Sequence, residues 1–160
     1  MITNRTQYDV DTAIRLRNEK VKFDPITMQP INPEELTESE IAILEKGTLT
    51  INTLNRIETK QEELKNLFND IGYWNTAILT KQWEYDNIFY GEQFDRILNN
   101  IVILRKSFFV YKDTPNIPDN NYRKYQTIND VEKILYDLDV MINDVKSHFR
   151  ECGTFECGEV

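Results

Sequence analysis

The sequence predicts a mainly α-helical protein: an antiparallel three-helix bundle with an N-terminal extended and helical arm and a short C-terminal hairpin or turn. Apolar residues recur at three- and four-residue spacing in three long stretches, as they do on one face of a helix. The prolines lie outside those stretches, at positions 25, 30, 33, 115 and 118. Three amphipathic helices with separating connectors can bury their apolar faces against one another as an antiparallel bundle.

Residues 1–46 are predicted to form the arm, with two short helices joined by a proline-bearing extended linker. Thr6 and Asp9 have the spacing of a capping box, which predicts the first helix. The linker, Phe23–Pro33, holds three prolines, which fix φ and lack an amide donor, so it is expected to be extended. Thr37-Glu38-Ser39-Glu40 is a second capping box, before a helix that Gly47 is expected to end.

Residues 47–149 are predicted to form the bundle, with an aromatic loop or strand insert at residues 73–90. The glycine at position 72 suits the end of the first long helix. The three helices are expected over residues 51–71, 92–108 and 127–149. Residues 150–160 are predicted to form a C-terminal hairpin or tail, because Cys152 and Cys157 are each followed by glycine.

The charge balance argues against nucleic acid as a partner. The formal net charge is −8, and an acidic chain repels a phosphate backbone. No stretch approaches the roughly 20 apolar residues that a membrane helix needs, so membrane insertion is not expected. The N-terminus lacks the apolar core of a signal peptide, which predicts synthesis in a cytoplasm and, by default, reduced cysteines. A disulfide, or a zinc site shared between subunits, stays open as an alternative.

Catalytic chemistry is not predicted. The single histidine, His148, lies near the end of the last helix, where its cation would suit the helix dipole. Two cysteines and one histidine fall short of the four ligands of a structural zinc site. We therefore expect no enzyme, no cofactor and no metal. The acidic side chains are expected on solvated helix faces; they include Glu58, Glu62, Glu63, Asp137, Asp139 and Asp144.

Aromatic residues of the 73–90 insert allow two interpretations. Trp74, Trp83 and Tyr85 could pack in the core or at a subunit interface, where such residues are enriched. They could instead form a platform that recognises carbohydrate. We expect protein interfaces to use aromatic and aliphatic residues of the arm, the insert and the tail. The candidate interface residues are Tyr8, Val10, Ile14, Phe23, Ile26, Trp74, Trp83, Tyr85 and Phe155.

Six short motifs follow one another along the chain: Arg5-Thr6 with Asp9-Val10; Leu54-Asn55-Arg56-Ile57-Glu58; Thr80-Lys81 with Trp83; Asn100-Ile101 with Leu104-Arg105; Thr114-Pro115 and Pro118 followed by residues 127–135; and the closing Cys-Gly-Glu. In this order they resemble the motifs of small proteins from the tail modules of phages and prophages of Gram-positive bacteria. The proline-rich Phe23–Pro33 segment departs from that pattern, because many relatives begin a helix sooner.

This resemblance implies a virion structural protein of the tail tip or baseplate, acting as an assembly or fibre-attachment component. Its expected partners are other phage tail or baseplate proteins and further copies of itself, and its expected location is the virion, after synthesis in the host cytoplasm. The alternative function is a receptor-binding module that recognises host cell-surface carbohydrate through Trp74–Tyr90.

Overall fold

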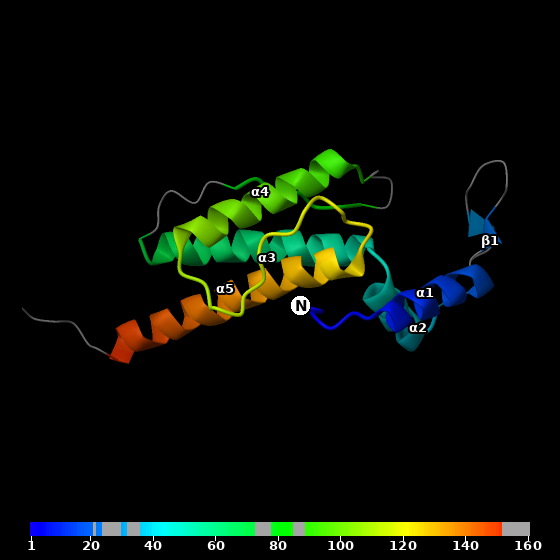
Figure 1. Ribbon diagram of the computed structural model, residues 1–160, viewed down its shortest axis with the longest axis horizontal. Helices are drawn as coiled ribbons and strands as arrows, with labels where there is room; N and C mark the ends of the chain where they lie inside the picture. Colours follow the sequence, from blue (N-terminus) through cyan, green and yellow to red (C-terminus); the bar gives the residue numbers. More distant parts are fainter. Residues whose placement is uncertain (21, 24–29, 32–35, 73–77, 85–88, 152–160) are drawn as a thin grey trace, which may run out of the picture.

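The computed structural model describes residues 1–20, 22–23, 30–31, 36–72, 78–84 and 89–151. Across this part the chain is mainly helical, which confirms the mainly α class predicted from the sequence (Figure 1). The elements, in chain order, are α1 (Gln7–Lys20), β1 (Lys22–Phe23), β2 (Pro30–Ile31), α2 (Glu38–Gly47), α3 (Ile51–Asp70), α4 (Gly91–Ser107) and α5 (Tyr125–Glu151). The two short strands pair antiparallel, Lys22 with Ile31 and Phe23 with Pro30.

Helices α1 and α2 pack against each other as an antiparallel pair, here called the helical hairpin. Asp9 Oδ1, near the start of α1, lies 3.0 Å from Nζ of Lys46 at the end of α2. At the opposite end, Glu40 Oε1 lies 3.7 Å from Nζ of Lys20. Both predicted capping boxes form: the amide of Thr6 donates to Asp9 at 2.7 Å, and that of Thr37 donates to Glu40 at 2.9 Å.

Gly47 lies where α1 and α2 approach each other closely. It is the last residue of α2, so the helix ends where the sequence predicts, and it is buried. A Cβ atom at this position would lie 2.2 Å from the carbonyl oxygen of Asp9 and 2.3 Å from Cβ of Ala13. The two helices can therefore pack this closely only with glycine at position 47.

We expect Gly47→Ala to open the helical hairpin and to destabilise it by about 1–3 kcal/mol, the usual cost of overpacking. Faster amide hydrogen exchange in α1 and α2, with unchanged exchange in α4, would report this. Gly91→Ala is the matched control, because a Cβ there meets only Nδ2 of Asn120 at 3.7 Å. Equal exchange in the two variants would contradict the close-approach role of Gly47.

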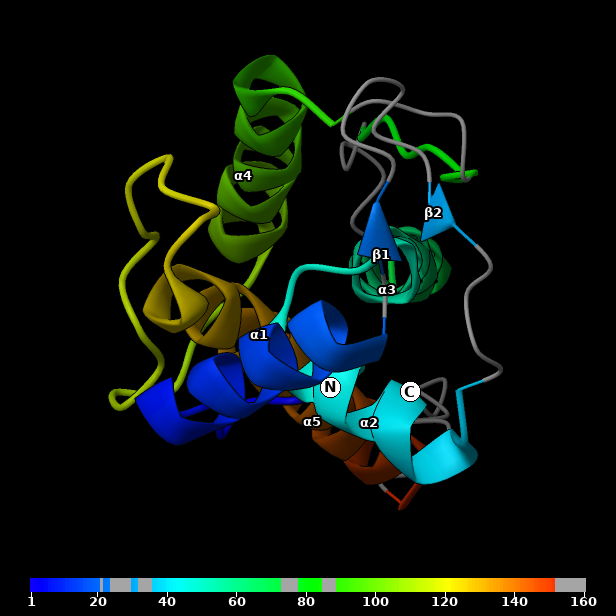
Figure 2. The ribbon, with the colours of Figure 1, turned by 90° about the vertical axis from the view of Figure 1, so that its right-hand side faces the viewer.

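The other three long helices, α3, α4 and α5, enclose the main core; with their connecting segments they are here called the body (Figures 1 and 2). Apolar side chains from all three helices meet there, together with Ile78 and Trp83 from the segment between α3 and α4. The largest fully buried apolar side chains are Phe68, Phe94, Ile57, Leu64, Ile97, Ile101, Leu104, Ile134, Leu135, Leu138 and Ile142.

The prediction of an antiparallel arrangement is wrong, because α3, α4 and α5 all run in the same direction (Figure 1). In each pair of helices, residues near the start of one helix contact residues near the start of the other, and residues near the end contact residues near the end. From α3 to α5, Arg56 pairs with Glu132 at 2.8 Å, and Asp70 pairs with Lys146 at 3.7 Å. From α3 to α4, Glu58 pairs with Arg96 near the start, and the ring of Phe68 packs on that of Phe108 near the end.

Two long connections make the parallel arrangement possible. A helix of 20 residues is about 30 Å long, and some ten extended residues can return along it. Residues 71–90 and 108–124 are each longer than that. The described part of the first connection, residues 78–84, runs back along α3, with Trp83 beside Asn55 and Thr80 beside Glu62. The second runs back along α5, with Tyr111 beside Asp144 and Thr114 beside Asp137.

Polar side chains of the helices hold the first connection through its backbone. The side-chain oxygen of Asn55 accepts a hydrogen bond from the Trp83 amide at 2.7 Å, and the side-chain nitrogen of Asn55 donates to the Trp83 carbonyl at 3.0 Å. The carbonyl of Leu79 accepts from Arg96 at 2.6 Å and from Asn100 at 2.8 Å. The predicted insert is thus a crossover between parallel helices, and residues 78–84 and 89–90 are irregular, with no strand among them.

Candidate binding site between the helical hairpin and the body

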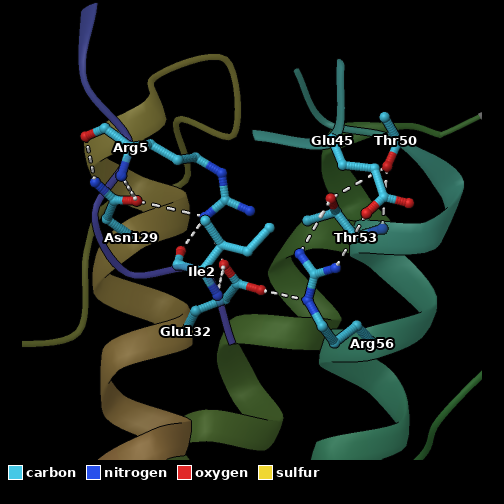
Figure 3. Close-up of polar contacts among 8 residues, drawn as sticks. All are labelled: Ile2, Arg5, Glu45, Thr50, Thr53, Arg56, Asn129 and Glu132. Atoms are coloured by element: carbon cyan, nitrogen blue, oxygen red, sulfur yellow. Dashed lines mark hydrogen bonds and ion pairs between the residues drawn. The ribbon is translucent and has the colours of Figure 1, made fainter. Parts of the chain in front are cut away.

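The N-terminal segment, residues 1–6, lies against the start of α5 and is held there by a buried ion pair (Figure 3). Nη1 of Arg5 lies 2.5 Å from Oε2 of Glu132, and the two side chains are 3% and 0% exposed. The Ile2 amide donates to the same oxygen at 3.1 Å. Asn129 exchanges two hydrogen bonds with the Arg5 backbone, accepting from its amide at 3.2 Å and donating to its carbonyl at 2.9 Å. These contacts fix the irregular N-terminal segment at Ile2 and at Arg5.

The same carboxylate also joins the segment to α3 and α2. Nε of Arg56 donates to Oε1 of Glu132 at 2.8 Å, and its guanidinium lies 4.0 Å from Glu45 of α2 (Figure 3). Burying a charge is costly unless it is paired and hydrogen-bonded, and here one carboxylate serves two guanidinium groups. The Glu132 cluster, comprising Arg5, Glu132, Arg56 and Glu45, therefore links the N-terminal segment, the helical hairpin and the body.

A cavity of about 440 Å³ lies beside this cluster, where the helical hairpin meets the body. Residues from both sides form its walls. They are Arg5, Val10, Ile14, Gly47, Thr48 and Leu49 from the N-terminal segment, the helical hairpin and the residues that join it to α3, and Leu54, Phe89, Tyr122, Arg123, Tyr125 and Ile128 from the body. Ile14 belongs to this wall and is also 47% exposed, so the cavity is open to solvent beside an apolar side chain.

The cavity wall holds two cations, of which Arg5 is already paired with the buried carboxylate of Glu132. The twelve wall residues include Arg5 and Arg123 but no aspartate or glutamate. Nη2 of Arg5 is buried and has no acceptor among the residues that the structure describes. Arg123 lies over the ring of Tyr122, with 5.9 Å from Cζ to the ring centroid, and has no carboxylate partner in the described part. A ligand with an apolar group and a negative charge matches these walls.

The structure brings two of the predicted interface residues together in the cavity wall, namely Val10 and Ile14. Tyr8 is on the outer surface of α1 and is 75% exposed. Phe23 lies in β1. Ile26, Trp74, Tyr85 and Phe155 lie outside the described residues, so their predicted roles stay predictions.

Trp83 packs in the core and has no free face for a sugar. It is 3% exposed, its ring meets Phe89 at 5.3 Å, and its indole N–H donates to Glu58 at 3.1 Å. This position agrees with the core interpretation of the aromatic insert. A carbohydrate site in this region would have to use other residues.

Several acidic side chains predicted to be solvated are instead buried or paired. Glu58 and Asp137 are 2% and 3% exposed. Glu58 binds Arg96, while Asp137 accepts from Thr114 at 2.7 Å and pairs with Lys133. Their hydrogen-bonding capacity is used to hold the two crossovers. The prediction of a solvated face is wrong for these two, because Glu58 accepts from the Lys81 amide and Asp137 from the Thr114 hydroxyl, and buried donors of this kind need hydrogen-bond partners.

The remaining sites considered from the sequence have simple environments. Within the described residues, no group of three histidine, cysteine or acidic side chains is placed to hold a metal ion. Nδ1 of His148 lies 2.7 Å from the carbonyl of Asp144, on an exposed part of α5. The predicted hairpin around Cys152 and Cys157 lies outside the described residues, and α5 extends to Glu151. None of the described helices has the length and apolarity to cross a membrane.

The charged contacts of the helical hairpin predict a loss of its order in acid. Hydrogen bonds from the Thr6 hydroxyl and from Lys46 hold the pKa of Asp9 below its ordinary value of 3.8. The Thr37 amide and hydroxyl similarly lower the pKa of Glu40 below 4.5. A depressed carboxyl pKa contributes stability above the unfolded pKa, and this stability is lost as pH falls through the folded pKa.

We expect NMR titration of the side-chain carboxyls to place the Asp9 midpoint below 3.8. Lys46→Met should raise that midpoint toward the ordinary value and leave the Glu40 midpoint unchanged, since Lys46 pairs with Asp9. A wild-type Asp9 midpoint at or above 3.8 would contradict the predicted pairing.

Comparison of the chain with protein-family models, with curated proteins and with solved structures finds no match.

Proposed function

We propose that this chain is a non-enzymatic virion structural protein of a phage tail tip or baseplate, acting as an assembly or fibre-attachment component. Its partners would be other tail or baseplate proteins and further copies of the chain. Under this proposal the chain is made in the host cytoplasm and resides in the virion. The ordered motifs quoted above suggest the phage setting, and the surface of the helical hairpin supports a role in binding proteins.

The observation that carries the proposal is the small buried core of the helical hairpin. Of its residues, only Ala13 and Gly47 are buried among those that the structure describes. Tyr8, Ile14, Ile41 and Ile43 are 75%, 47%, 41% and 38% exposed. A unit that buries so little and exposes several large apolar side chains is typical of one that another protein covers.

The architecture in this proposal is a three-helix bundle formed by α3, α4 and α5, with residues 1–46 as an arm and the Cys152–Cys157 region as a short hairpin or turn. The arm would lie on a neighbouring subunit while the bundle gives it a rigid base. Symmetric copies would then close into a ring, the usual way in which identical subunits build such parts.

Purified phage particles test the proposal directly. A tagged copy of the chain should band with particles in a density gradient, and antibody labelling in electron micrographs should locate it at the tail tip. Tyr8→Ser with Ile41→Ser should reduce incorporation while the purified variant keeps its helical circular dichroism. Leu79→Ser is a matched control, because Leu79 is 75% exposed on the body. Absence of the wild-type chain from purified particles would refute the proposal.

A further inference from the structure

The cavity between the helical hairpin and the body has walls that specify the chemistry of an occupant. Apolar side chains from α1, α3 and α5 would receive an apolar group, since burying such a group releases water from both surfaces. Arg123 would favour a neighbouring carboxylate, and no wall residue carries a negative charge to oppose it, while Arg5, whose charge is paired with Glu132, has only Nη2 without an acceptor in the described part. The expected occupant is therefore a peptide with an aromatic or aliphatic side chain next to an acidic one.

Residues 152–160 of the chain have this composition. They contain Phe155 followed directly by Glu156, a second acid at Glu159, and no lysine or arginine. Phe155 would supply the apolar group, and Glu156 the adjacent negative charge, that the cavity walls favour. The cavity wall can attract this acidic segment, whereas the chain as a whole, with a formal net charge of −8, would repel it.

This segment cannot reach the cavity of its own molecule. Tyr125, at the start of α5, is a wall residue, and Glu151 ends the same helix after 27 residues. At 1.5 Å per residue the two ends are about 39 Å apart. Phe155 follows Glu151 by four residues, which span at most about 14 Å when extended. Figure 1 shows the end of α5 on the side of the molecule opposite to the helical hairpin.

We propose that residues 152–160 of one copy bind in the cavity between the helical hairpin and the body of a second copy, with Phe155 among the apolar walls and Glu156 beside Arg123. Such a contact is heterologous, so repeating it gives a closed ring or an open filament. It also fixes the angle between the hairpin and the body of the receiving copy. The contact rests on the proposed function only in its assumption that copies meet during assembly.

Fluorescence anisotropy with a labelled peptide tests the contact. The peptide covers residues 150–160, with Cys152→Ser and Cys157→Ser to avoid oxidation. The receptor is the full chain carrying Phe155→Ala and Glu156→Gln, so that its own segment does not compete. We expect saturable binding that weakens as salt is raised, because an ion pair contributes to it. A peptide of the same composition in scrambled order should bind at least about tenfold more weakly, a difference of 1.4 kcal/mol.

Variants of the receptor identify the site. Ile14→Trp fills the cavity from a position that is 47% exposed, so it should abolish peptide binding without unfolding the chain. Arg123→Gln should weaken binding and reduce its dependence on salt. Lys106→Gln is the matched control: it removes the same charge from an exposed residue near the end of α4, and it should change nothing.

The oligomeric state of the full chain gives an independent result. Light scattering during size-exclusion chromatography should show concentration-dependent association of the wild-type chain, and none for Phe155→Ala with Glu156→Gln. No peptide binding, equal binding by the scrambled peptide, or undiminished binding to the Ile14→Trp receptor would each overturn the proposed contact. Because these measurements use purified protein, their failure is distinguishable from absence of the chain in phage particles.

Discussion

Replacing Glu132 by leucine is expected to lower the free energy of unfolding by about 3–5 kcal/mol, the range for breaking a buried ion pair. The carboxylate of Glu132 is fully buried and lies 2.5 Å from Arg5 and 2.8 Å from Arg56. Without it, the 3% exposed side chain of Arg5 keeps its charge in an interior that solvates it poorly. Domains are commonly stable by only ~5–15 kcal/mol, so urea unfolding should show a clear fall in midpoint.

Two further variants separate the charge from the packing at this position. Glu132→Gln retains one acceptor and should cost less, roughly 1–3 kcal/mol. Adding Arg5→Met to Glu132→Leu should recover part of the loss, because no buried charge is then left without a partner. The Ile2 amide should exchange faster in every variant that lacks the carboxylate, since it donates to Glu132. A Glu132→Leu chain within about 0.5 kcal/mol of wild type would show that the Glu132 cluster contributes little.

The positions of the helices could be predicted because their signals are local. A capping box depends on residues three apart, and the Thr37–Glu40 box forms as the sequence indicates. Gly72 follows α3 with a φ of 94°, the left-handed conformation that glycine adopts readily. The apolar stripe predicts a helix over residues 51–71, and α3 covers Ile51–Asp70. Each of these features is determined within one or two turns of chain.

The relative direction of the helices could not be predicted from the same signals. An amphipathic stripe buries equally well against a parallel or an antiparallel neighbour, so periodicity carries no information on direction. The length of the connections does carry some, because short loops force antiparallel neighbours. The 20-residue connection 71–90 and the 17-residue connection 108–124 are long enough to cross back, as the observed contacts show.

The Glu132 cluster was missed because its members are far apart in the sequence: Arg5 and Glu132 are separated by 127 residues. A local signal nevertheless existed. Glu132 follows Ile128 by four residues and precedes Leu135 by three, so it lies on the apolar stripe of α5. Glu58 has the same relation to Leu54. A carboxylate on an apolar stripe must find a buried partner, which makes such positions candidates for long-range ion pairs.

Replacing Glu58 by alanine is the second change expected to have a large effect, again about 3–5 kcal/mol of unfolding free energy. Glu58 is 2% exposed and accepts four hydrogen bonds: two from the guanidinium of Arg96, one from the indole of Trp83 and one from the Lys81 amide. Alanine removes all these acceptors at once. The crossover at residues 78–84 should therefore lose contact with α3, in addition to the loss of global stability.

Tryptophan fluorescence can separate that local release from general destabilisation. In a Trp74→Phe background, emission reports on Trp83 alone, and Glu58→Ala should shift it to longer wavelength under conditions where circular dichroism still shows a folded chain. Glu63→Ala is the matched control on the same helix, because the Glu63 side chain is 52% exposed and its pair with Lys60 should contribute only ~0–1 kcal/mol. Unchanged Trp83 emission in folded Glu58→Ala protein would contradict this role of the carboxylate. The apolar contacts of Trp83, such as that with the ring of Phe89 at 5.3 Å, would then be sufficient to hold the crossover.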